Sequence, residues 1–210
     1  MTIRHFFTGP IDVNTYLCFD ETRTAFVVDP GGPSPDLLHL LKEEQLTLAY
    51  ILLTHGHADH FGGIPSLKES FPAVKILACR DEETLLEDPR LNASLAMLGQ
   101  ALSVRVDVWV EDGDRLTIGN TDLIFRQTPG HTRGGLCILG DGFVFSGDTL
   151  FRLSVGRTDF YGGSYPDLIR SIKEVLFTLP DDTTVYPGHM ETTTIGYEKM
   201  YNPFVQDGRK

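Results

Sequence analysis

The chain has 210 residues, of which 41% are hydrophobic and 22% are charged, as is usual for a globular protein. We expect one compact domain over residues 1–210, because a single hydrophobic core grows efficiently up to about 250 residues. Acidic residues outnumber basic ones by 29 to 18, and the formal net charge is −11. Such an acidic surface repels phosphate backbones and anionic lipids, which argues against nucleic-acid and membrane partners.

Targeting signals and cysteines point to one compartment. No apolar run reaches the roughly 20 residues that a membrane helix needs. The first 19 residues lack a basic segment followed by an apolar stretch and a cleavage site, so we expect no signal peptide. Cys18, Cys79 and Cys137 lie far apart in apolar or mixed runs, which favours buried free thiols. We therefore expect a cytoplasmic protein.

The first half of the chain alternates between strand and helix patterns. Short apolar runs predict strands at residues 3–7, 13–19, 25–28, 50–53 and 75–78. Ser34 followed by Pro35 is typical of a helix start, and leucines continue the pattern at helical spacing. A second helix is expected at about residues 62–70, and further helical segments up to about Met97.

The second half begins with a series of strands. Their predicted ranges are residues 104–110, 115–118, 123–126, 136–139 and 143–145. A glycine-rich stretch at residues 147–163 contains no clear element, and loops of this length are often functional. Ser164 then caps an amphipathic helix, followed by a strand at 184–186 and a helix at 191–201. Strands followed by helices, twice over, predict two face-to-face β-sheets with helices outside.

Three of the seven histidines fall within six consecutive positions, in the run Thr54-His55-Gly56-His57-Ala58-Asp59-His60. In an extended chain, residues i and i+2 face the same way, so His55 and His57 can reach one metal ion. Asp59 and His60 lie where the chain turns into the next helix, so they can reach a second one. Zinc, iron and manganese all accept imidazole and carboxylate ligands. The alternative is a polar loop, but so dense a group of histidines has little structural use.

Three further candidates follow predicted strands. His131 and His189 each come after a proline and a glycine, which turn the chain and present the histidine beside the strand end. Asp148 follows the strand at 143–145 in the same way, and a carboxylate there can bridge two metal ions. Alone, each would be read as a surface turn residue. His5 and His39 have no such neighbours and are left out.

These donors suffice for two metal sites. One site takes His55, His57, His131 and Asp148, and the other takes Asp59, His60, His189 and the same Asp148. Two dications against two carboxylates and one hydroxide leave about one net positive charge, which attracts an anionic substrate and stabilises an oxyanion. Metal-bound water has a pKa of about 7, so hydroxide is available as the nucleophile. Asp59 and Asp148 are therefore also the candidate catalytic residues.

The order of these motifs resembles the metallo-β-lactamase fold superfamily. The matching runs are HGHADH at 55–60, PGHT at 129–132, GDTLF at 147–151 and PGH at 187–189, with VDPG at 28–31 resembling the opening aspartate motif. The resemblance implies an α/β fold, a four-layer αββα sandwich with the metal site at one edge of the sheets. It also implies that Asp29 orients the ligands, and that two divalent metal ions are bound, with zinc expected and iron or manganese as alternatives.

Within the superfamily, the chain is similar to glyoxalase II, the hydroxyacylglutathione hydrolases, and in particular to their short single-domain bacterial relatives. The run GDTLF carries much of this likeness, together with residues 192–198 and 202–204. The resemblance implies a dinuclear hydrolase that cleaves a thioester, such as a hydroxyacyl-glutathione-like substrate, by attack of a metal-bound hydroxide. Hydrolysis of another ester, lactone or amide is the nearest alternative.

Two other readings stay open. The run GRTDF at 156–160 is shared with the persulfide dioxygenases, which resemble glyoxalase II but use one iron, so an oxidoreductase is possible. A non-catalytic metal-binding or interaction protein on an old hydrolase scaffold is the third reading, and the complete ligand set argues against it. The expected partner is a small molecule, an anionic thioester.

Substrate-binding candidates lie in the glycine-rich stretch. Arg157 follows the bridging aspartate closely, so it can clamp a substrate carboxylate in a bidentate pair. The alternative role for Arg157 is a structural ion pair with Asp159. Tyr161, in the same stretch, is the second substrate-binding candidate.

Overall fold

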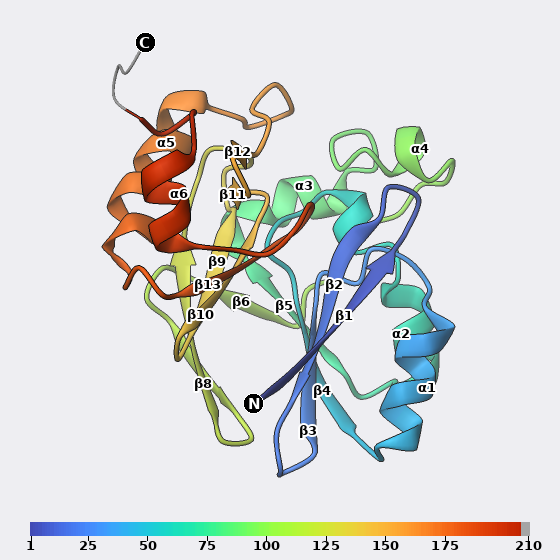
Figure 1. Cartoon of the computed structure of the whole chain (residues 1–210). Coiled ribbons are helices and arrows are strands. Elements are labelled where there is room, and N and C mark those ends of the chain that lie inside the picture. Colours follow the sequence, from blue (N-terminus) through green and yellow to red (C-terminus); the bar gives the residue numbers. More distant parts are fainter. Residues whose placement is uncertain (207–210) are drawn as a thin grey trace.

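The computed structural model describes residues 1–206, which form two six-stranded sheets with helices on both outer faces (Figure 1). The first sheet has the strand order β1-β2-β3-β4-β5-β6, and the second has β14-β13-β10-β9-β8-β7. This is a four-layer αββα sandwich, as the sequence predicts. No helix among residues 1–206 is long and apolar enough to cross a membrane.

The first sheet is built from the N-terminal half of the chain. Its strands are β1 (Thr2–Thr8), β2 (Val13–Phe19), β3 (Thr24–Val28), β4 (Thr47–Leu52), β5 (Lys75–Cys79) and β6 (Val108–Val110). The first three pair antiparallel, and β3 to β6 pair parallel. The parallel crossovers carry α1 (Pro35–Glu43) and α2 (Ile64–Ser70), which cover the outer face of this sheet (Figure 1). Further along, the chain forms the short helices α3 (Glu83–Glu87) and α4 (Ser94–Met97).

The second sheet is built from the C-terminal half. Its strands are β7 (Arg115–Ile118), β8 (Thr121–Gln127), β9 (Leu136–Gly140), β10 (Phe143–Gly147), β13 (Thr184–Pro187) and β14 (Thr193–Thr194). Only β10 and β13 pair parallel, and the crossover between them carries the hairpin β11 (Leu150–Phe151) and β12 (Ser154–Val155) and then α5 (Tyr165–Glu174). Helix α6 (Ile195–Tyr201) joins α5 on the outer face of this sheet (Figure 1).

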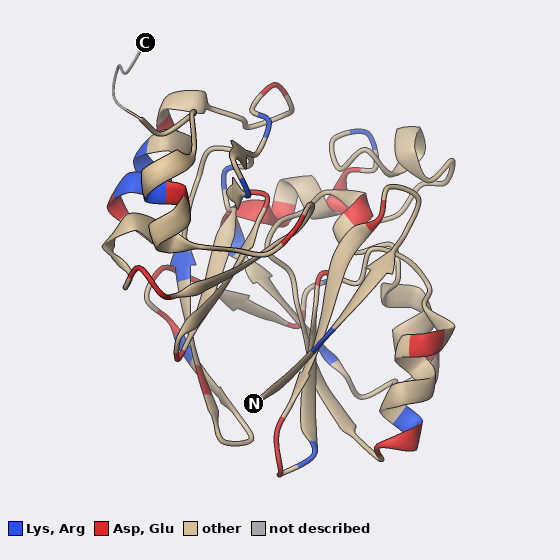
Figure 2. Cartoon of the chain, viewed as in Figure 1, with Lys and Arg blue, Asp and Glu red and all other residues tan. Residues whose placement is uncertain are grey.

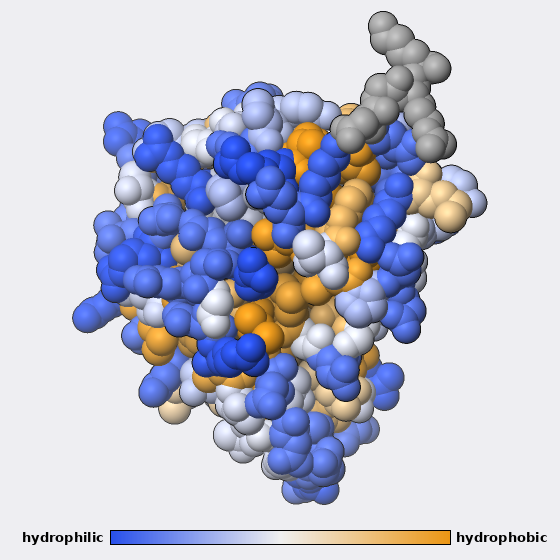
Figure 3. Space-filling view, turned by 90° about the vertical axis from the view of Figure 1, so that its left-hand side faces the viewer, coloured by the Kyte–Doolittle hydropathy of each residue, from blue (hydrophilic) through white to orange (hydrophobic). Residues whose placement is uncertain are grey.

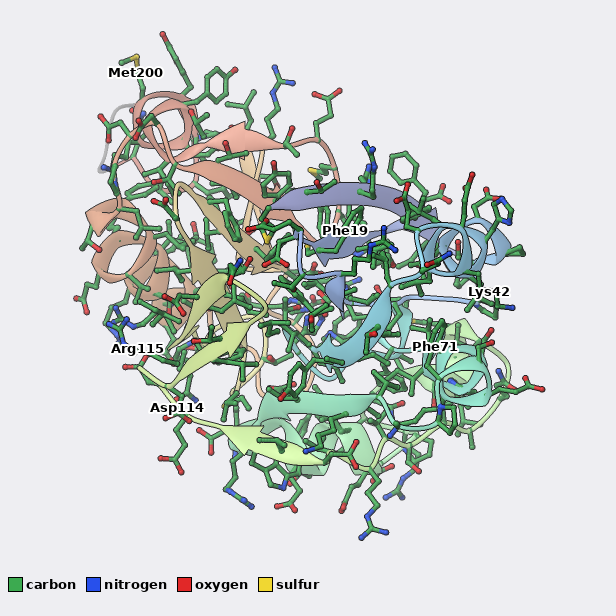
Figure 4. The ribbon with its side chains drawn as sticks, turned by 90° about the horizontal axis from the view of Figure 1, so that it is seen from below. Phe19, Lys42, Phe71, Asp114, Arg115 and Met200 are labelled. Carbon is green, nitrogen blue, oxygen red and sulfur yellow. The ribbon has the colours of Figure 1, made fainter. Side chains whose placement is uncertain are left out.

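Three apolar layers hold the sandwich together. The central layer fills the space between the sheets with side chains from both, including Phe26, Phe125 and Phe145, each at most 1% exposed. The second layer packs the first sheet against α1 and α2, and the third packs the second sheet against α5 and α6. Truncating a buried phenylalanine to alanine costs about 3–5 kcal/mol, so each layer contributes substantially to stability. Figure 4 shows this arrangement from below, with Lys42 and Phe71 on one helical layer and Met200 on the other.

Local sequence explains where the helices begin. Ser34 and Ser164 accept backbone N–H bonds at the first turns of α1 and α5, and a proline stands near the start of each helix. Helix α6 begins at Ile195 rather than at the expected residue 191, because residues 193–194 first pair with β13 and Thr194 then caps the helix.

Two further predictions need correction. The strand expected at 104–110 spans only Val108–Val110, because residues 104–107 form isolated hydrogen bonds instead of a strand ladder. There the Val104 N–H donates to the Leu86 carbonyl, and the Asp107 carboxylate accepts the Ile76 N–H at 2.9 Å. The stretch 147–163, expected to lack elements, contains the β11–β12 hairpin.

The surface is mixed in character. Figure 2 shows acidic and basic residues spread over helices and loops, with Lys and Arg at separate positions rather than in one continuous face in this view. Seen from the side of α5 and α6, Figure 3 shows a strip of hydrophobic surface between hydrophilic areas. The expectation of buried thiols is confirmed, since all three cysteines are free and buried.

Candidate metal centre

The seven predicted ligands meet at one edge of the sandwich. His55 and His57 follow β4 of the first sheet, and Asp59 and His60 lie in the single 3₁₀ turn that comes next. The other three ligands follow strands β8, β10 and β13 of the second sheet; they are His131, Asp148 and His189. The site is therefore built where the carboxyl ends of strands from both sheets come together.

Two separate groups of ligands have donor atoms close enough to share an ion, and a third set with equally close donor atoms, His55, His60 and Asp148, links them. His55, His57 and His131 form the first group, with donor atoms within 4.8 Å of one another. In it, His57 Nδ1 lies 2.9 Å from His131 Nε2. Asp59, His60 and His189 form the second group under the same limit. Asp59 Oδ2 lies 3.4 Å from His60 Nε2 and 3.3 Å from His189 Nε2.

Asp148 lies between the two groups. Its Oδ2 is 3.6 Å from His131 Nε2 in the first group and 3.7 Å from His189 Nε2 in the second. Its Oδ1 is 3.5 Å from His60 Nε2. One carboxylate thus reaches both groups, which is the position that a bridging ligand requires.

Hydrogen bonds behind the ligands fix which ring nitrogen faces the site. The Asp29 carboxylate accepts from His60 Nδ1 at 2.9 Å and from the Thr54 hydroxyl at 2.6 Å. Because that hydroxyl donates to Asp29, it can accept from His55 Nδ1, which lies 3.1 Å away. His131 Nδ1 donates to the Arg157 carbonyl at 2.7 Å. In the neutral form of each of these three rings, Nε2 is the acceptor atom that faces the cluster, as metal ligation requires.

Unsatisfied polar atoms test whether a metal fits. Among residues 1–206, five buried side-chain polar atoms have no hydrogen-bond partner, and four of them belong to this cluster. Those four are His55 Nε2, His57 Nε2, His60 Nε2 and Asp148 Oδ1. His57 offers Nδ1 to the first group, so its Nε2 is not the ligating atom, and the other three atoms carry the test. A buried polar atom without a partner costs about 1–3 kcal/mol, so three such atoms together are unfavourable unless a cation is bound. The donor set of imidazole and carboxylate suits zinc, iron or manganese.

Electrostatics within the cluster point the same way. Burial and the neighbouring His131 lower the pKa of His57 to about 3, and burial with nearby histidines holds the pKa of His55 well below its usual value. Burial also disfavours a charged His60, but the carboxylates of Asp59, Asp148 and Asp29 outweigh it and raise the pKa of His60. Burial opposes ionisation of Asp59, yet His60 and His189 hold the pKa of Asp59 well below its usual value. His55 and His57 are therefore neutral rings, and the anionic oxygens around His60 favour a positive charge there, either a proton or a metal cation.

Glu82 is a buried residue of this region that sequence reasoning missed. It is 1% exposed and lies in the 3₁₀ turn Arg80–Glu82 that precedes α3. Its Oε2 accepts the Gly56 N–H at 2.6 Å, and its Oε1 accepts the Gly134 N–H at 2.6 Å. Gly56 stands between His55 and His57, and Gly134 follows His131 by three positions. One carboxylate therefore ties together the two loops that supply the first group of ligands.

Close approach to Glu82 explains both glycines. A Cβ added at Gly56 would lie 2.9 Å from Glu82 Oε2, and one at Gly134 would lie 2.8 Å from the Glu82 backbone nitrogen. Neither position has room for a side chain. In the sequence, Glu82 stands in the acidic run Asp81-Glu82-Glu83, which looks like an exposed helix start, so no local signal distinguishes it.

The two substrate-binding candidates lie in different places. Arg157 lines the cavity over the cluster, but its guanidinium forms a bidentate pair with Asp159, with distances of 2.7 and 2.6 Å. It also lies 4.0 Å over the Phe160 ring. The structural pair anticipated as the alternative is thus present. Tyr161 does not line this cavity; it lines a smaller one near α3, where Arg133 lies over its ring.

A cavity of about 330 Å³ opens over the cluster. Its floor contains His57, Asp59, His131, Asp148 and His189. Its walls are largely apolar and come from separate parts of the chain: Ile11, Met97, Phe151, Val155, Phe160 and Met190. Its volume lies at the low end of the roughly 300–1,000 Å³ usual for small-molecule sites. These wall residues were not predicted, because nothing in the sequence marks segments so far apart as neighbours.

The family model described as the Metallo-beta-lactamase superfamily matches residues 8–189. Among relatives, the chain is 36% identical to the hydroxyacylglutathione hydrolase GloC of Haemophilus influenzae, over 91% of this chain and 92% of that protein. It is 35% identical to the probable metallo-hydrolase YqgX of Bacillus subtilis, over 94% of both chains.

Solved structures agree with this match. The B3 metallo-β-lactamase BLEG-1 superposes with a TM-score of 0.91 at 36% identity, covering 97% of this chain and 99% of that one. TTHA1623, solved in a di-iron-bound form, gives 0.83 at 34% identity, covering 96% and 99%. ETHE1 from Myxococcus xanthus gives 0.79 at 32% identity, covering 97% and 84%.

Proposed function

This chain belongs to the metallo-β-lactamase superfamily, and we propose that within it the chain is a dinuclear metal-dependent hydrolase that cleaves thioesters. The position of Asp148 carries the dinuclear part of this proposal, because its carboxylate lies within 3.7 Å of ligands from both groups. A mononuclear centre has no need for a complete second group or for a carboxylate between the two.

The residues have distinct tasks in the proposed reaction. Divalent cations held by the two groups supply Lewis acidity and lower the pKa of water to about 7. Asp29, Thr54 and the Arg157 carbonyl keep the histidine rings in ligating orientation. Asp59 and Asp148 place anionic oxygens on the cavity floor, where a proton released from the attacking water can be accepted. The apolar walls surround the reacting carbonyl and strengthen its electrostatic interactions with the cluster.

The proposed thioester specificity rests on the similarity of this chain to a hydroxyacylglutathione hydrolase. GloC is a hydroxyacylglutathione hydrolase by name, and the chain covers nearly all of its length. Among the described residues that line the cavity, Ser154 is the one serine, and no cysteine lines it. Within residues 1–206, no hydrogen bond joins the Ser154 hydroxyl to a base, so activated water is the nucleophile that we propose. We propose zinc as the resident metal, and iron as the alternative because TTHA1623 is known in a di-iron form.

The persulfide dioxygenase alternative is less well supported. The segment 156–160 that suggested it has a positioning contact here, since the Arg157 carbonyl accepts from His131 Nδ1. That contact serves a hydrolase equally well. The seven-ligand cluster favours two ions over the single iron of the dioxygenase reading.

A combined measurement tests the proposed function. The purified protein would be loaded with zinc or iron, its metal content determined, and its activity measured against a panel of thioesters, esters and lactones. We expect close to two metal ions per chain and thioester hydrolysis that a chelator abolishes. Binding of a single tightly held ion with excess metal present would contradict the dinuclear site, and oxygen uptake with a persulfide would favour the dioxygenase.

A further inference from the structure

The mouth of the metal cavity is unusually apolar for an acidic protein. Ile11, Phe160 and Met190 are 47%, 39% and 56% exposed, although each lines the cavity. They come from the β1–β2 turn, the segment after β12 and the loop after β13. Single exposed apolar residues are common, but a group of them around one opening marks a binding surface.

Charged groups at the mouth are already neutralised. Arg157 is the one Lys or Arg among the described residues that line this cavity, and its guanidinium is paired with Asp159 and stacked on Phe160. A substrate with several carboxylates, as the likeness to hydroxyacylglutathione hydrolases suggests, would meet no free cationic side chain on the walls. Beyond the cluster itself, the walls present hydrocarbon, aromatic and thioether surface.

The wall residues can adapt to their ligand. Met97 and Met190 are far apart in the sequence, but both line the cavity. Met97 ends α4, and Met190 lies in the loop after β13. Methionine is unbranched and polarisable, so it packs against apolar groups of varied shape. The Phe160 ring packs edge-on against His57 at 5.2 Å, which continues the apolar wall down to the ligands.

We propose that this wall is a subsite for an unbranched or aromatic apolar group of the substrate, lying next to the carbonyl that is hydrolysed. The inference rests on the proposed hydrolase function and refines its substrate class. The apolar group can belong to the acyl part or to the thiol part, since both flank the same carbonyl. Burial of a methylene is worth about 0.8 kcal/mol, which corresponds to about a fourfold gain in kcat/KM when the group is fully enclosed.

Two thioester series test the subsite in the metal-loaded enzyme. The first varies the acyl chain from acetyl to hexanoyl on N-acetylcysteamine, and the second varies the thiol chain from ethyl to hexyl on an acetyl group, all below micelle-forming concentrations. In one series we expect kcat/KM to rise by about twofold to fourfold per methylene and then level off when the chain extends past the walls. The series that shows the rise identifies which part occupies the subsite.

Variants of the wall methionines test whether the rise in kcat/KM with chain length depends on the cavity wall. Met190→Gln and Met97→Gln keep the side-chain length and add polarity, so each should flatten the dependence on chain length. Met200→Gln is the control, because Met200 is similarly exposed, at 63%, on α6 and does not line the cavity. Equal flattening by all three variants, or a rise that survives in Met190→Gln and Met97→Gln alike, would overturn the subsite.

A binding measurement separates this inference from the proposed function. Straight-chain carboxylates from butanoate to octanoate, titrated into the metal-loaded protein, should bind more tightly with length, and less steeply so in Met190→Gln. Length-dependent binding without hydrolysis of any thioester would support the subsite and contradict the hydrolase. Hydrolysis that is indifferent to chain length in both series, with equally indifferent binding, would contradict the subsite and leave the hydrolase standing.

Discussion

Glu82 accepts the backbone N–H of Gly56 at 2.6 Å, and through this bond a buried carboxylate from the start of α3 holds the turn between His55 and His57. The other oxygen of Glu82 holds the loop that follows His131 through Gly134. Because backbone amides are the donors, these two bonds do not depend on the side chains of the loops.

Replacing Glu82 by glutamine should weaken the first metal group selectively. The amide offers one acceptor oxygen, and its NH₂ group would face the N–H of Gly56 or Gly134, leaving a buried donor unsatisfied. Replacing a residue that orients metal ligands typically lowers metal affinity by about 10–100-fold. We expect a loss of that size at the group of His55, His57 and His131. Competition with a chelator, combined with cobalt spectra of each site, measures it.

The control for this variant is Glu83→Gln, one position further along, where the side chain is exposed. It should leave both sites and the melting temperature unchanged. A Glu82→Gln protein that loses both ions equally, in proportion to a lower melting temperature, would show that Glu82 acts on the fold alone.

Asp148→Ala should damage the centre more than Asp59→Ala. Asp148 approaches ligands of both groups, whereas Asp59 approaches only His60 and His189. Removing Asp148 also removes negative charge between two cations, whose mutual repulsion is then less screened. We expect Asp148→Ala to lower the affinity for both ions, and Asp59→Ala to lower that of one. Metal titrations of the two variants decide this, and matching losses would argue against a shared ligand.

Binding of a cation to the second group should release a proton. The pKa of His60 is raised in the metal-free chain by Asp59, Asp148 and Asp29, despite burial, so its ring carries a proton at neutral pH. That proton must leave before Nε2 can ligate, and affinity there should fall by up to about tenfold per pH unit below the raised pKa. His57, with a pKa of about 3, and His55, lowered by burial, are already neutral, so the first group should change less.

Calorimetry in buffers of different ionisation enthalpy, at pH values from about 6 to 8, counts the released protons. The expected count is about one for the ion that binds at the second group. The same heat in all buffers for both ions would mean that His60 is neutral before binding.

The ion pair of Arg157 and Asp159 gives a direct test of the clamp hypothesis. If the guanidinium binds a substrate carboxylate, then Asp159→Ala should free it and lower KM for a thioester with a carboxylate on its thiol part. Arg157→Ala should then raise that KM, by about tenfold for a charge-assisted bond of about 1.5 kcal/mol. A neutral thioester of similar size serves as the reference. Because Arg157 is paired with Asp159, we expect the structural role instead of the clamp. In that case, each variant changes KM by the same factor for the charged and the neutral thioester.

The ligands could be predicted because their signal is local. His55, His57 and His131 can be recognised by their residue type and by their position after a predicted strand. Any fold that aligns the ends of these strands brings the three side chains together. Asp29 could be predicted only through the resemblance of its VDPG run to the opening aspartate motif of the superfamily. The strand at 104–110 was predicted too long, because Asp107 satisfies the Ile76 N–H with its side chain, and an apolar run does not reveal such a bond.

Glu82 and the cavity wall could not be predicted, for a different reason. Glu82 acts through glycines 26 residues before it and 52 residues after it, and its own surroundings in the sequence are acidic and polar. Ile11, Met97 and Met190 become neighbours only when both sheets are assembled. Contacts of this kind depend on tertiary structure alone, so no periodicity or motif marks them.

The division of ligands between the sheets has a mechanical consequence. Four of the proposed ligands come from the loop after β4 in the first sheet and three from loops of the second, so ions bound as proposed would cross-link the two halves of the sandwich at one edge. All three cysteines are free and buried, so this junction is not a disulfide. A ligand present at 100 times its dissociation constant stabilises the folded state by about 2.7 kcal/mol. Removal of metal should therefore loosen the two halves at that edge first, and hydrogen exchange should rise in the loops after β4 and β8 before it rises between the sheets.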